Sequence, residues 1–395
     1  MLTRRFGVRN WELVEDVVQS ALERALRSWS LSGVPPNPSA WLHRVASNLA
    51  IDTLRRDARW NELDSLNEIP APGNSRNSDT TDTEEVQDNL LRMIYVCCHP
   101  DVPAESQIAL ALKTLCGFGN AEIARALLTT EASVAKRITR AKQRLRELQV
   151  GPSELTPDAI KQRLPDVQSV VYLLFNEGYC STIVDKPIRE ELCEEAVRLG
   201  LILAEHQLTQ GPETAALLAL LLYHAARLEA RVDASGALLL LKEQDRSLWD
   251  QRLLQTASYW FERAAEGENL TRYHAEAWIA SEHCRATSVE DTNWEYVATG
   301  YDLLCVLAPS PVHELNRAIA IGHREGPHAG LEAFSAIKAD AFAVDYYLWH
   351  ATRAELCRQT GDVETALAAL QEAWKLAPTN SEKELICRKM DGLTK

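Results

Sequence analysis

The sequence contains no apolar run long enough to cross a membrane, although 46% of its 395 residues are apolar. The longest run lies around residues 215–223. It falls well short of the ~20 apolar residues that a transmembrane helix requires. We also find no signal-peptide pattern at the N-terminus. The sequence therefore predicts a cytoplasmic protein that makes no contact with a membrane, and its length predicts several domains.

Paired cysteine spacings are also missing. The nine cysteines form neither a CxxC redox motif nor the spacing of a zinc site. Cys97, Cys98 and His99 are consecutive, and three consecutive side chains on a helix diverge and cannot easily surround one ion. We therefore expect reduced thiols, with no metal and no cofactor, and we assign His283 and Cys284 to packing.

The C-terminal part lacks a recognisable catalytic set, so we expect that the protein is not an enzyme. Two segments there contain grouped polar residues, Phe175–Gly178 and Asp245–Arg246. Either segment could line a pocket. Structural roles in helix caps and turns are the favoured interpretation, because Asn and Asp often serve there.

Charge is unevenly distributed along the chain. The formal net charge of −14 by itself argues against nucleic-acid binding. Residues 1–149 hold 19 Lys and Arg against 19 Asp and Glu, whereas residues 150–395 hold 23 against 37. Within residues 131–146, six bases face one acid. The acidic average thus conceals a basic patch beside an acidic C-terminal part, which indicates two modules with different partners.

The basic patch belongs to a predicted pair of helices joined by a tight turn, over residues 117–146. At about 100° per residue, the second helix has an apolar stripe and an opposed polar and basic face. The stripe consists of Val134, Ile138, Ala141, Leu145 and Leu148, and the opposed face of Ser133, Lys136, Arg137, Arg140 and Arg144. Such a helix suits a DNA groove. A merely solvated basic face is the alternative, but Ile123 and Ala124 in the preceding short helix favour DNA binding.

Helical periodicity accounts for almost all of the rest, so the predicted fold class is all-α. The first helices span about 12–29 and 40–56. Residues 61–86 hold seven acids against one base and predict a disordered linker, which could also cover the basic helix. Near the C-terminus, two segments that lead to Gly326 and Gly361 resemble each other, with the spacing of a tetratricopeptide (TPR) repeat.

Several segments, in chain order, resemble a bacterial extracytoplasmic-function (ECF) RNA polymerase sigma factor. Residues 15–22 resemble the helix by which sigma domain 2 grips the polymerase clamp. Residues 41–56 resemble the W-L…A-x-N-x-A-x-D-x-L-R-R segment that opens and reads the −10 element. Residues 117–146 match sigma domain 4, which reads the −35 element. The two matches at this separation are more specific than either match alone.

Four further segments, 172–179, 245–250, 308–312 and 350–356, look like the ECF subgroup with a long TPR-containing C-terminal extension. The resemblance implies sigma domain 2 at 1–60, a flexible acidic linker at 61–86, sigma domain 4 with its helix-turn-helix at 87–149, and an acidic, all-helical, TPR-like regulatory domain at 150–395. Family members usually carry further helical residues before Leu2. We therefore expect a start codon upstream of Met1 or an N-terminally shortened domain 2.

In domain 2, the resemblance implies that Asn48 contacts a flipped −10 base through its amide, which can donate and accept at a base edge. Phosphates would be held by Arg44, Arg55 and Arg56. Asp16 and Gln19, one turn apart, would contact core RNA polymerase. We assign Trp41 to the core rather than to base stacking.

In domain 4, Ser133, Lys136 and Arg137 lie near the N-terminal end of the second helix, the part that usually reaches base edges. Arg140 and Arg144 lie further along and are better placed for phosphates. The predicted protein is a sigma factor that binds core RNA polymerase and promoter DNA, with its C-terminal domain contacting and regulating the sigma domains. The alternatives are a helix-turn-helix regulator that does not engage polymerase, and a TPR-type scaffold with a decayed sigma half.

Overall fold

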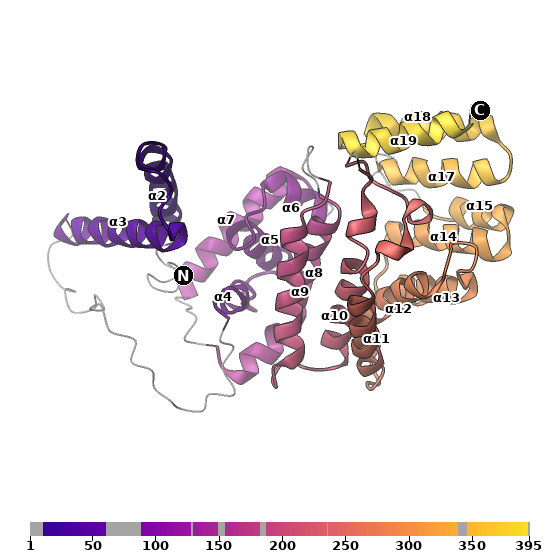
Figure 1. Ribbon diagram of the computed structural model, residues 1–395. Helices are drawn as coiled ribbons and strands as arrows, with labels where there is room; N and C mark the ends of the chain where they lie inside the picture. Colours follow the sequence, from indigo (N-terminus) through magenta and orange to yellow (C-terminus); the bar gives the residue numbers. More distant parts are fainter. Residues whose placement is uncertain are drawn as a thin grey trace. The chain divides into compact units, whose positions relative to one another are not determined.

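The predicted all-α fold class is confirmed. A computed structural model describes residues 11–60, 88–127, 129–148, 155–181, 187–234, 236–338 and 346–393 (Figure 1). Within these ranges, the β pairing consists of one isolated antiparallel bridge, between Val232 and Leu238. The chain divides into two compact units. The first unit comprises residues 1–117 and 132–166, and the second comprises residues 118–131 and 167–395. The predicted linker at 61–86 lies outside the described residues.

The first unit begins with a helical hairpin, α2 (Trp11–Ser32) and α3 (Pro38–Trp60). Its small core consists of Val14, Val17, Ala21, Ala46 and Ala50. Alanines at the contact let the two helix axes approach closely. The hairpin turns at a glycine with φ of 81°, and the Asn37 side chain accepts a hydrogen bond from the Ala40 N–H at 2.9 Å at the start of α3.

The rest of the first unit contains α4 (Asn89–Cys97), α5 (Ala104–Thr114) and α7 (Glu131–Leu148). Asp88 caps α4 by accepting a hydrogen bond from the Leu91 N–H at 2.8 Å. The buried Gln107 amide donates to the carbonyls of His99 and Val102, at 2.9 and 2.7 Å. These bonds fix the loop between α4 and α5 and therefore position the N-terminus of α5.

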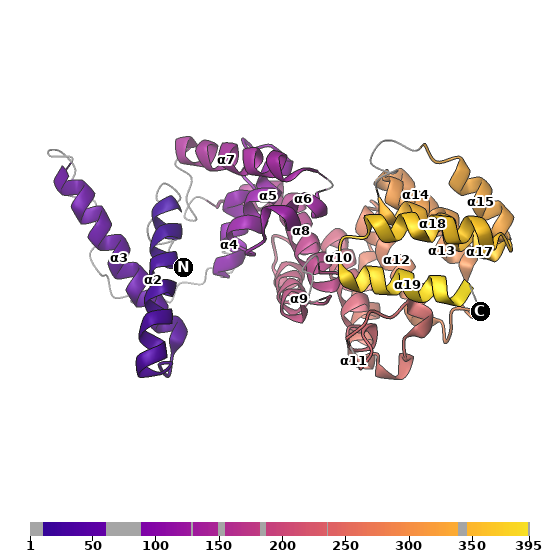
Figure 2. The same ribbon diagram turned by 90° about the horizontal axis from the view of Figure 1, so that it is seen from above.

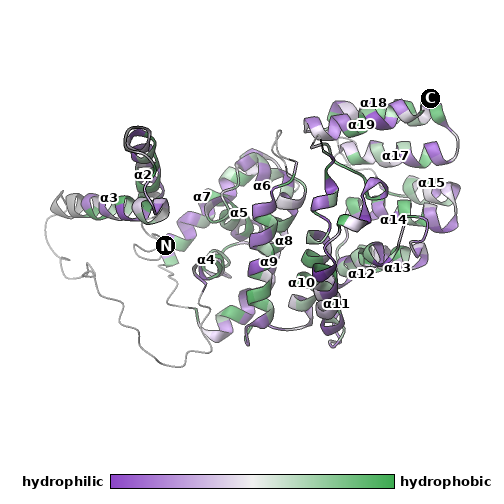
Figure 3. Cartoon of the chain, in the orientation of Figure 1, coloured by the Kyte–Doolittle hydropathy of each residue, from purple (hydrophilic) through white to green (hydrophobic). Residues whose placement is uncertain are grey.

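The second unit is an array of helices. Its elements are α6 (Asn120–Ala126), most of α8 (Pro157–Tyr179), α9 (Glu190–Glu205), α10 (Pro212–Ala225), α11 (Gln251–Ala264), α12 (Arg272–Arg285), α13 (Trp294–Leu307), α14 (Pro311–Glu325), α15 (Pro327–Ser335), α17 (Tyr347–Gln359), α18 (Val363–Leu376) and α19 (Asn380–Leu393). Three short 3-10 turns, η3 (Glu229–Arg231), η4 (Leu241–Glu243) and η5 (Arg246–Leu248), lie between α10 and α11. Apolar and polar residues alternate around most helices, as amphipathic helices require (Figure 3).

Helix α10 forms the centre of this array. All residues from Thr214 to Tyr223 are buried, and α9, α11 and α12 pack around the helix. A helix that is apolar on every side must be covered on every side. This helix contains the longest apolar run of the sequence. Among the described residues, none of the helices has the length and apolar character to span a bilayer.

Consecutive helices from α12 to α19 pack against one another in chain order (Figures 1 and 2). Gly326 and Gly361, which end the two similar sequence segments, each lie at the turn within a helix pair, α14–α15 and α17–α18. Their φ values are 103° and 84°, a region that favours glycine. The spacing of these two glycines therefore marks equivalent turns, while the assignment to the TPR class stays a prediction.

Candidate functional site

Helix α7 has the buried stripe that the sequence predicts. Val134, Ile138, Ala141 and Leu145 are buried, and Leu148 is half-buried. These residues share one side because a helix advances about 100° per residue. The other side of the helix is therefore left for solvent or for a ligand.

The opposed face of α7 is the candidate nucleic-acid surface, and we call it the cationic face. Its members are Ser133, Lys136, Arg137, Arg140 and Arg144. Lys136, Arg140 and Arg144 are exposed, and Ser133 and Arg137 are half-buried. The structure thus brings all five predicted residues to one side of a helix.

Two arginines of the cationic face are held by carboxylates of the first unit. Arg137 forms an ion pair with Glu105 in the first turn of α5. The Arg144 Nη2 lies 3.1 Å from an Asp101 carboxylate oxygen, and its Nη1 lies 3.4 Å from Glu147. Exposed ion pairs contribute only about 0–1 kcal/mol. A ligand can therefore displace these carboxylates at little cost. Sequence reasoning missed Asp101 and Glu105, which no helical spacing links to α7.

The short helix α6 follows a tight turn. Gly117 has φ of 76°, which L side chains rarely adopt. The Glu122 carboxylate accepts a hydrogen bond from the Gly119 N–H, and this bond caps the helix. Ile123 and Ala124 are buried, as expected. The turn and the cap set where α6 begins.

Helix α6 is bound to the C-terminal end of the chain by a polar cluster in the second unit. The Arg125 Nη2 lies 2.8 Å from an oxygen of Glu382, whose side chain is 6% exposed. Glu382 also accepts hydrogen bonds from the Tyr347 hydroxyl at 2.8 Å and from the N–H and hydroxyl of Thr379 at 3.1 and 2.9 Å. Burial and the neighbouring carboxylate raise the pKa of Tyr347. The hydrogen bonds from Tyr347 and Thr379 therefore hold the Glu382 carboxylate in position for its ion pair with Arg125.

A second ion pair holds the other end of α6. The Arg189 Nη1 lies 3.1 Å from Glu122 and 3.9 Å from the buried Glu177. Arg189 directly precedes α9, and its backbone N–H donates to the Gly178 carbonyl at 2.7 Å. The two charged side chains of α6, Glu122 and Arg125, thus both bind residues far away in the sequence.

The residues predicted to read the −10 element lie on α3. Asn48 and Arg44 are exposed, one helical turn apart. Arg55 and Arg56 belong to the same helix, and their side chains lie outside the described part. The half-buried Trp41 packs edge-on against Trp29, with ring centroids 5.5 Å apart. This contact agrees with a packing role for Trp41.

Helix α2 carries an apolar surface beside the residues predicted to contact polymerase. Asp16 and Gln19 are both exposed. Val18, Leu22 and Leu26 are 38%, 48% and 76% exposed, and they share the side of the helix that holds Gln19. We call these three residues the α2 apolar strip. Sequence reasoning placed them in the helix but did not separate them from its core residues, because helical spacing alone does not decide which side α3 covers.

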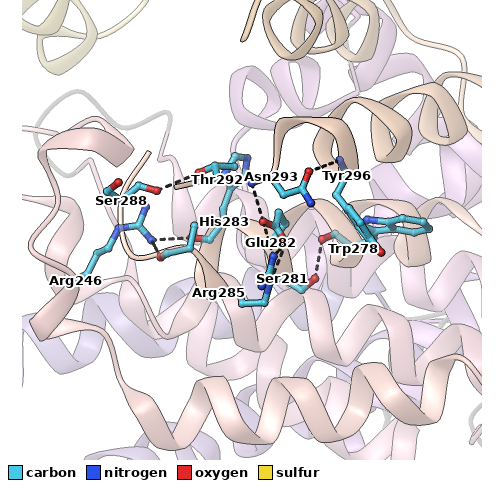
Figure 4. Close-up of polar contacts among 11 residues, drawn as sticks. Arg246, Trp278, Ser281, Glu282, His283, Arg285, Ser288, Thr292, Asn293 and Tyr296 are labelled. Atoms are coloured by element: carbon cyan, nitrogen blue, oxygen red, sulfur yellow. Dashed lines mark hydrogen bonds and ion pairs between the residues drawn. The ribbon is translucent and has the colours of Figure 1, made fainter. Parts of the chain in front are cut away.

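The segment 245–250 serves as caps and turns, as favoured from the sequence. Asp245 accepts a hydrogen bond from the Ser247 N–H at 2.9 Å, and Asp250 accepts from the N–H groups of Arg252 and Leu253 at 2.8 and 3.1 Å. Arg246 donates to the carbonyls of His283 and Ala286, at 2.8 and 2.6 Å, at the C-terminal end of α12 (Figure 4). A cation at a helix C-terminus is favourable. This arginine therefore ties η5 to α12.

The segment 175–178 packs inside the second unit. Phe175 and Glu177 are buried. Gly178 lies against α9 so closely that a Cβ there would be 2.7 Å from the Cys193 Sγ and 2.8 Å from the Arg189 carbonyl oxygen. Only glycine fits such an approach. These contacts support the structural interpretation of this segment.

All nine cysteines are free thiols. Burial raises the pKa of the Cys97 thiol to about 12 and that of Cys284 to about 11. Burial, together with Arg227 and Arg246, lowers the pKa of His283 to about 4. These side chains are therefore neutral near pH 7. Among the described residues, His, Cys, Asp and Glu form no group of three that could hold a metal ion.

Three protein families match parts of the chain. Sigma-70 region 2 matches residues 2–60, and Sigma-70, region 4 matches residues 92–145. A family of unknown function, DUF6596, matches residues 163–265. The two sigma-70 matches cover α2, α3 and most of α7, whereas the third match lies in the second unit from residue 167 onward.

Two curated relatives are similar to the chain over different extents. The uncharacterized protein R00370 of Rhizobium meliloti (strain 1021) is 38% identical over 390 residues, which cover 98% of this chain and 91% of that protein. The ECF RNA polymerase sigma factor SigM of Mycobacterium tuberculosis is 29% identical over 144 residues, 36% of this chain and 68% of SigM. No solved structure matches the chain.

Proposed function

We propose a sigma-factor mechanism for this chain, which belongs to the same family as the Rhizobium meliloti protein R00370 and carries sigma-70 regions 2 and 4. These regions, with the similarity to SigM, support an ECF-type sigma factor whose partners are core RNA polymerase and promoter DNA. The observation that carries the proposal is that each region exposes a distinct surface, one apolar and one cationic. The protein would act in the cytoplasm, and bond formation would belong to the polymerase.

The α2 apolar strip, with Asp16 and Gln19 beside it, is the surface that we assign to core RNA polymerase. Exposed apolar side chains grouped on one helix face and flanked by polar groups are typical of protein-protein contacts. Asp16 and Gln19 would give the contact its register through hydrogen bonds. The leucines would supply most of its buried area.

The exposed face of α3 is the surface that we assign to the −10 element. Asn48 would hydrogen-bond the edge of an unstacked base, because an amide both donates and accepts. Arg44, Arg55 and Arg56 would neutralise the backbone of the captured strand. No enzyme chemistry is required, since single-strand capture itself favours the open promoter.

The cationic face of α7 is the surface that we assign to the −35 element. Ser133, Lys136 and Arg137 would approach base edges, and Arg140 and Arg144 would hold phosphates. On binding, a base edge would take the place of Glu105 at Arg137, and a phosphate would take the place of Asp101 at Arg144. The chain would then bind DNA despite its net negative charge, because the basic residues are concentrated on this face.

We further propose that the TPR-like second unit regulates region 4 through α6. The ion pairs of Arg125 with Glu382 and of Glu122 with Arg189 support this proposal, because both hold a helix of the region-4 match. A change in the packing of α19 or of the start of α9 would move or release α6. The DNA-binding competence of the chain would then depend on its own C-terminal helices.

The polymerase surface is tested by a single charge on α2. Leu22→Asp should reduce copurification with core RNA polymerase about tenfold or more, because a carboxylate would be desolvated at the contact. Leu22 is 48% exposed, so the fold should tolerate the change. Leu201→Asp, at a 38% exposed leucine of α9, is the matched control and should bind as the unmodified chain does. Equal binding by Leu22→Asp would contradict the assigned surface. No binding by the unmodified chain would favour the polymerase-independent regulator.

A further inference from the structure

A cavity of about 230 Å³ lies among the last three helices of the second unit and η4. Part of its wall is apolar and consists of Leu240, Leu370, Leu385 and Leu393. The cavity is smaller than the ~300–1,000 Å³ of sites for drug-sized ligands. Its occupant would therefore be a small molecule.

Charged side chains complete the wall, and the basic ones are in excess. They are Lys242, Arg358, Arg388, Lys389, Glu243 and Glu355. The Arg358 Nη2 lies 2.6 Å from Glu355, and its Nε donates to the same carboxylate at 3.1 Å, so these two charges compensate each other. Glu243 accepts a hydrogen bond from the Leu240 N–H at 2.7 Å, which caps η4. This excess is unusual in a part of the chain where acids greatly outnumber bases.

Lys389 is a half-buried basic residue of the wall, and the charges of Glu355 and Glu243 partly favour its ammonium form. Within the described residues, its ammonium group has neither an ion pair nor a hydrogen bond. Burial lowers its pKa, since water is replaced by protein around the charge. Arg388 on the same helix is exposed and donates to the Leu238 carbonyl, a neutral acceptor. A partly buried ammonium group that forms no ion pair favours an anion in the cavity beside it.

We propose that this cavity binds a small organic anion. Its carboxylate or phosphate group would lie against Lys389, Arg388 and Lys242, and its short apolar part would lie against the leucines. The excess of basic side chains in the wall favours a negatively charged ligand. The cavity volume limits its size, and the leucines favour a molecule with an alkyl segment over an inorganic ion.

The cavity is placed so that ligand binding could affect α6 through α19. This point rests on the proposed function. Lys389 and Glu382 both belong to α19, about 10 Å apart along the helix axis. Glu382 holds Arg125 of α6. A ligand bound to Lys389 would hold the C-terminal half of α19. The first turn of the same helix carries Glu382, which contacts α6 in the region-4 match.

Titration calorimetry on the full chain tests the site with four probes: hexanoate, hexyl phosphate, inorganic phosphate and hexanol. We expect one of the two hexyl anions to bind with a 1:1 stoichiometry, at least tenfold more tightly than hexanol or inorganic phosphate. The preferred head group distinguishes a carboxylate ligand from a phosphate ligand. Lys389→Gln should weaken this binding about tenfold or more, because a charge-assisted hydrogen bond is lost.

Lys383→Gln is the matched control, since Lys383 lies on α19 outside the cavity, over the Trp374 ring. It should leave binding unchanged. Lys242→Gln, at an exposed residue of η4, should weaken binding in the same direction and keeps the test valid if Lys389→Gln misfolds. Equal binding of hexanol, equal losses in both α19 variants, or no heat with either hexyl anion would overturn the proposal.

The assay contains neither DNA nor polymerase, so a failure of ligand binding leaves the sigma role standing. Ligand binding by a chain that does not direct transcription would contradict only the sigma role.

Discussion

At the residue scale, the cationic face of α7 contains arginines with different tasks. Arg137 lies near the N-terminal end of the helix, and Arg144 lies two turns further on. Of these two arginines, Arg137 is therefore the one that would reach base edges. We predict that Arg137→Ala changes the order of preference among −35 sequences, with losses of about 1–3 kcal/mol at the preferred one. Arg144→Ala should weaken binding to all sequences alike and lower the salt slope by about 1.

Binding of labelled duplexes with varied −35 elements, at several salt concentrations, measures both effects. Lys113→Ala, on α5 away from the cationic face, is the control and should change neither preference nor slope. Indistinguishable effects of Arg137→Ala and Arg144→Ala across all duplexes would refute the division of roles.

A second residue-scale effect concerns the buried His283. Its pKa is lowered to about 4 in the folded chain, first by burial and then by Arg227 and Arg246, whereas in the unfolded chain it titrates near 6.5. Between these values the unfolded state binds more protons, so stability falls as the pH is lowered from 6.5 to 4. This group should account for up to about 3 kcal/mol of that loss.

Urea unfolding of the full chain at pH 7 and at pH 4.5 measures this contribution. His283→Gln should reduce the difference between the two pH values. His328→Gln, at an exposed histidine of α15, should leave the difference unchanged. An identical pH dependence in His283→Gln and the unmodified chain would mean that another group carries the effect.

At the element scale, α6 is too short to be stable by itself and depends on its partners. Arg125→Gln removes its ion pair with the buried Glu382 and should loosen the helix. We expect backbone amides of residues 120–126 to exchange faster with deuterium, corresponding to about 1–3 kcal/mol of lost local stability. Arg198→Gln, which removes an exposed pair with Glu195 on α9, should not alter that exchange. Unchanged exchange in Arg125→Gln would remove the proposed link between α6 and α19.

Helix pairing in the C-terminal array depends on a close approach between two glycines. A Cβ on Gly330 would lie 2.8 Å from the Gly322 Cα and 2.8 Å from a methyl group of Leu356. Gly330→Ala should therefore destabilise the second unit by about 1–3 kcal/mol. Gly392→Ala meets nothing within 4 Å and should be neutral or slightly stabilising, because alanine favours a helix. Thermal melts compare the two, and equal stability of both variants would contradict the packing.

The element scale also shows what could be predicted from the sequence. The stripe of α7 follows from the helical period, a local rule that operates within a few residues. The pairing of Arg125 with Glu382 joins residues 257 positions apart. No local rule selects that glutamate among the many acids of the C-terminal part. The exposure of Leu22 and Leu26 is likewise decided by what α3 covers, because their helical period also suits a core.

At the scale of the whole molecule, the two compact units differ from the division by sequence composition. Composition predicts a break near residue 150, whereas residues 118–131 cluster with residues 167–395. In this grouping, Glu122 and Arg125 bind Arg189 and Glu382 within the second unit. A truncation near residue 150 therefore removes partners of α6 as well as the C-terminal array. Point substitutions test the regulation more cleanly than a deletion does.

The central claim is that this chain directs core RNA polymerase to particular promoters. Run-off transcription with core enzyme and a template pool from the source genome measures it directly, using the full chain beside Leu22→Asp and Arg137→Ala. We predict promoter-specific transcripts with the full chain, none with Leu22→Asp, and a changed set with Arg137→Ala. A core enzyme that a known sigma factor activates on its own promoter, but that gives no specific transcript with this chain, would contradict the account.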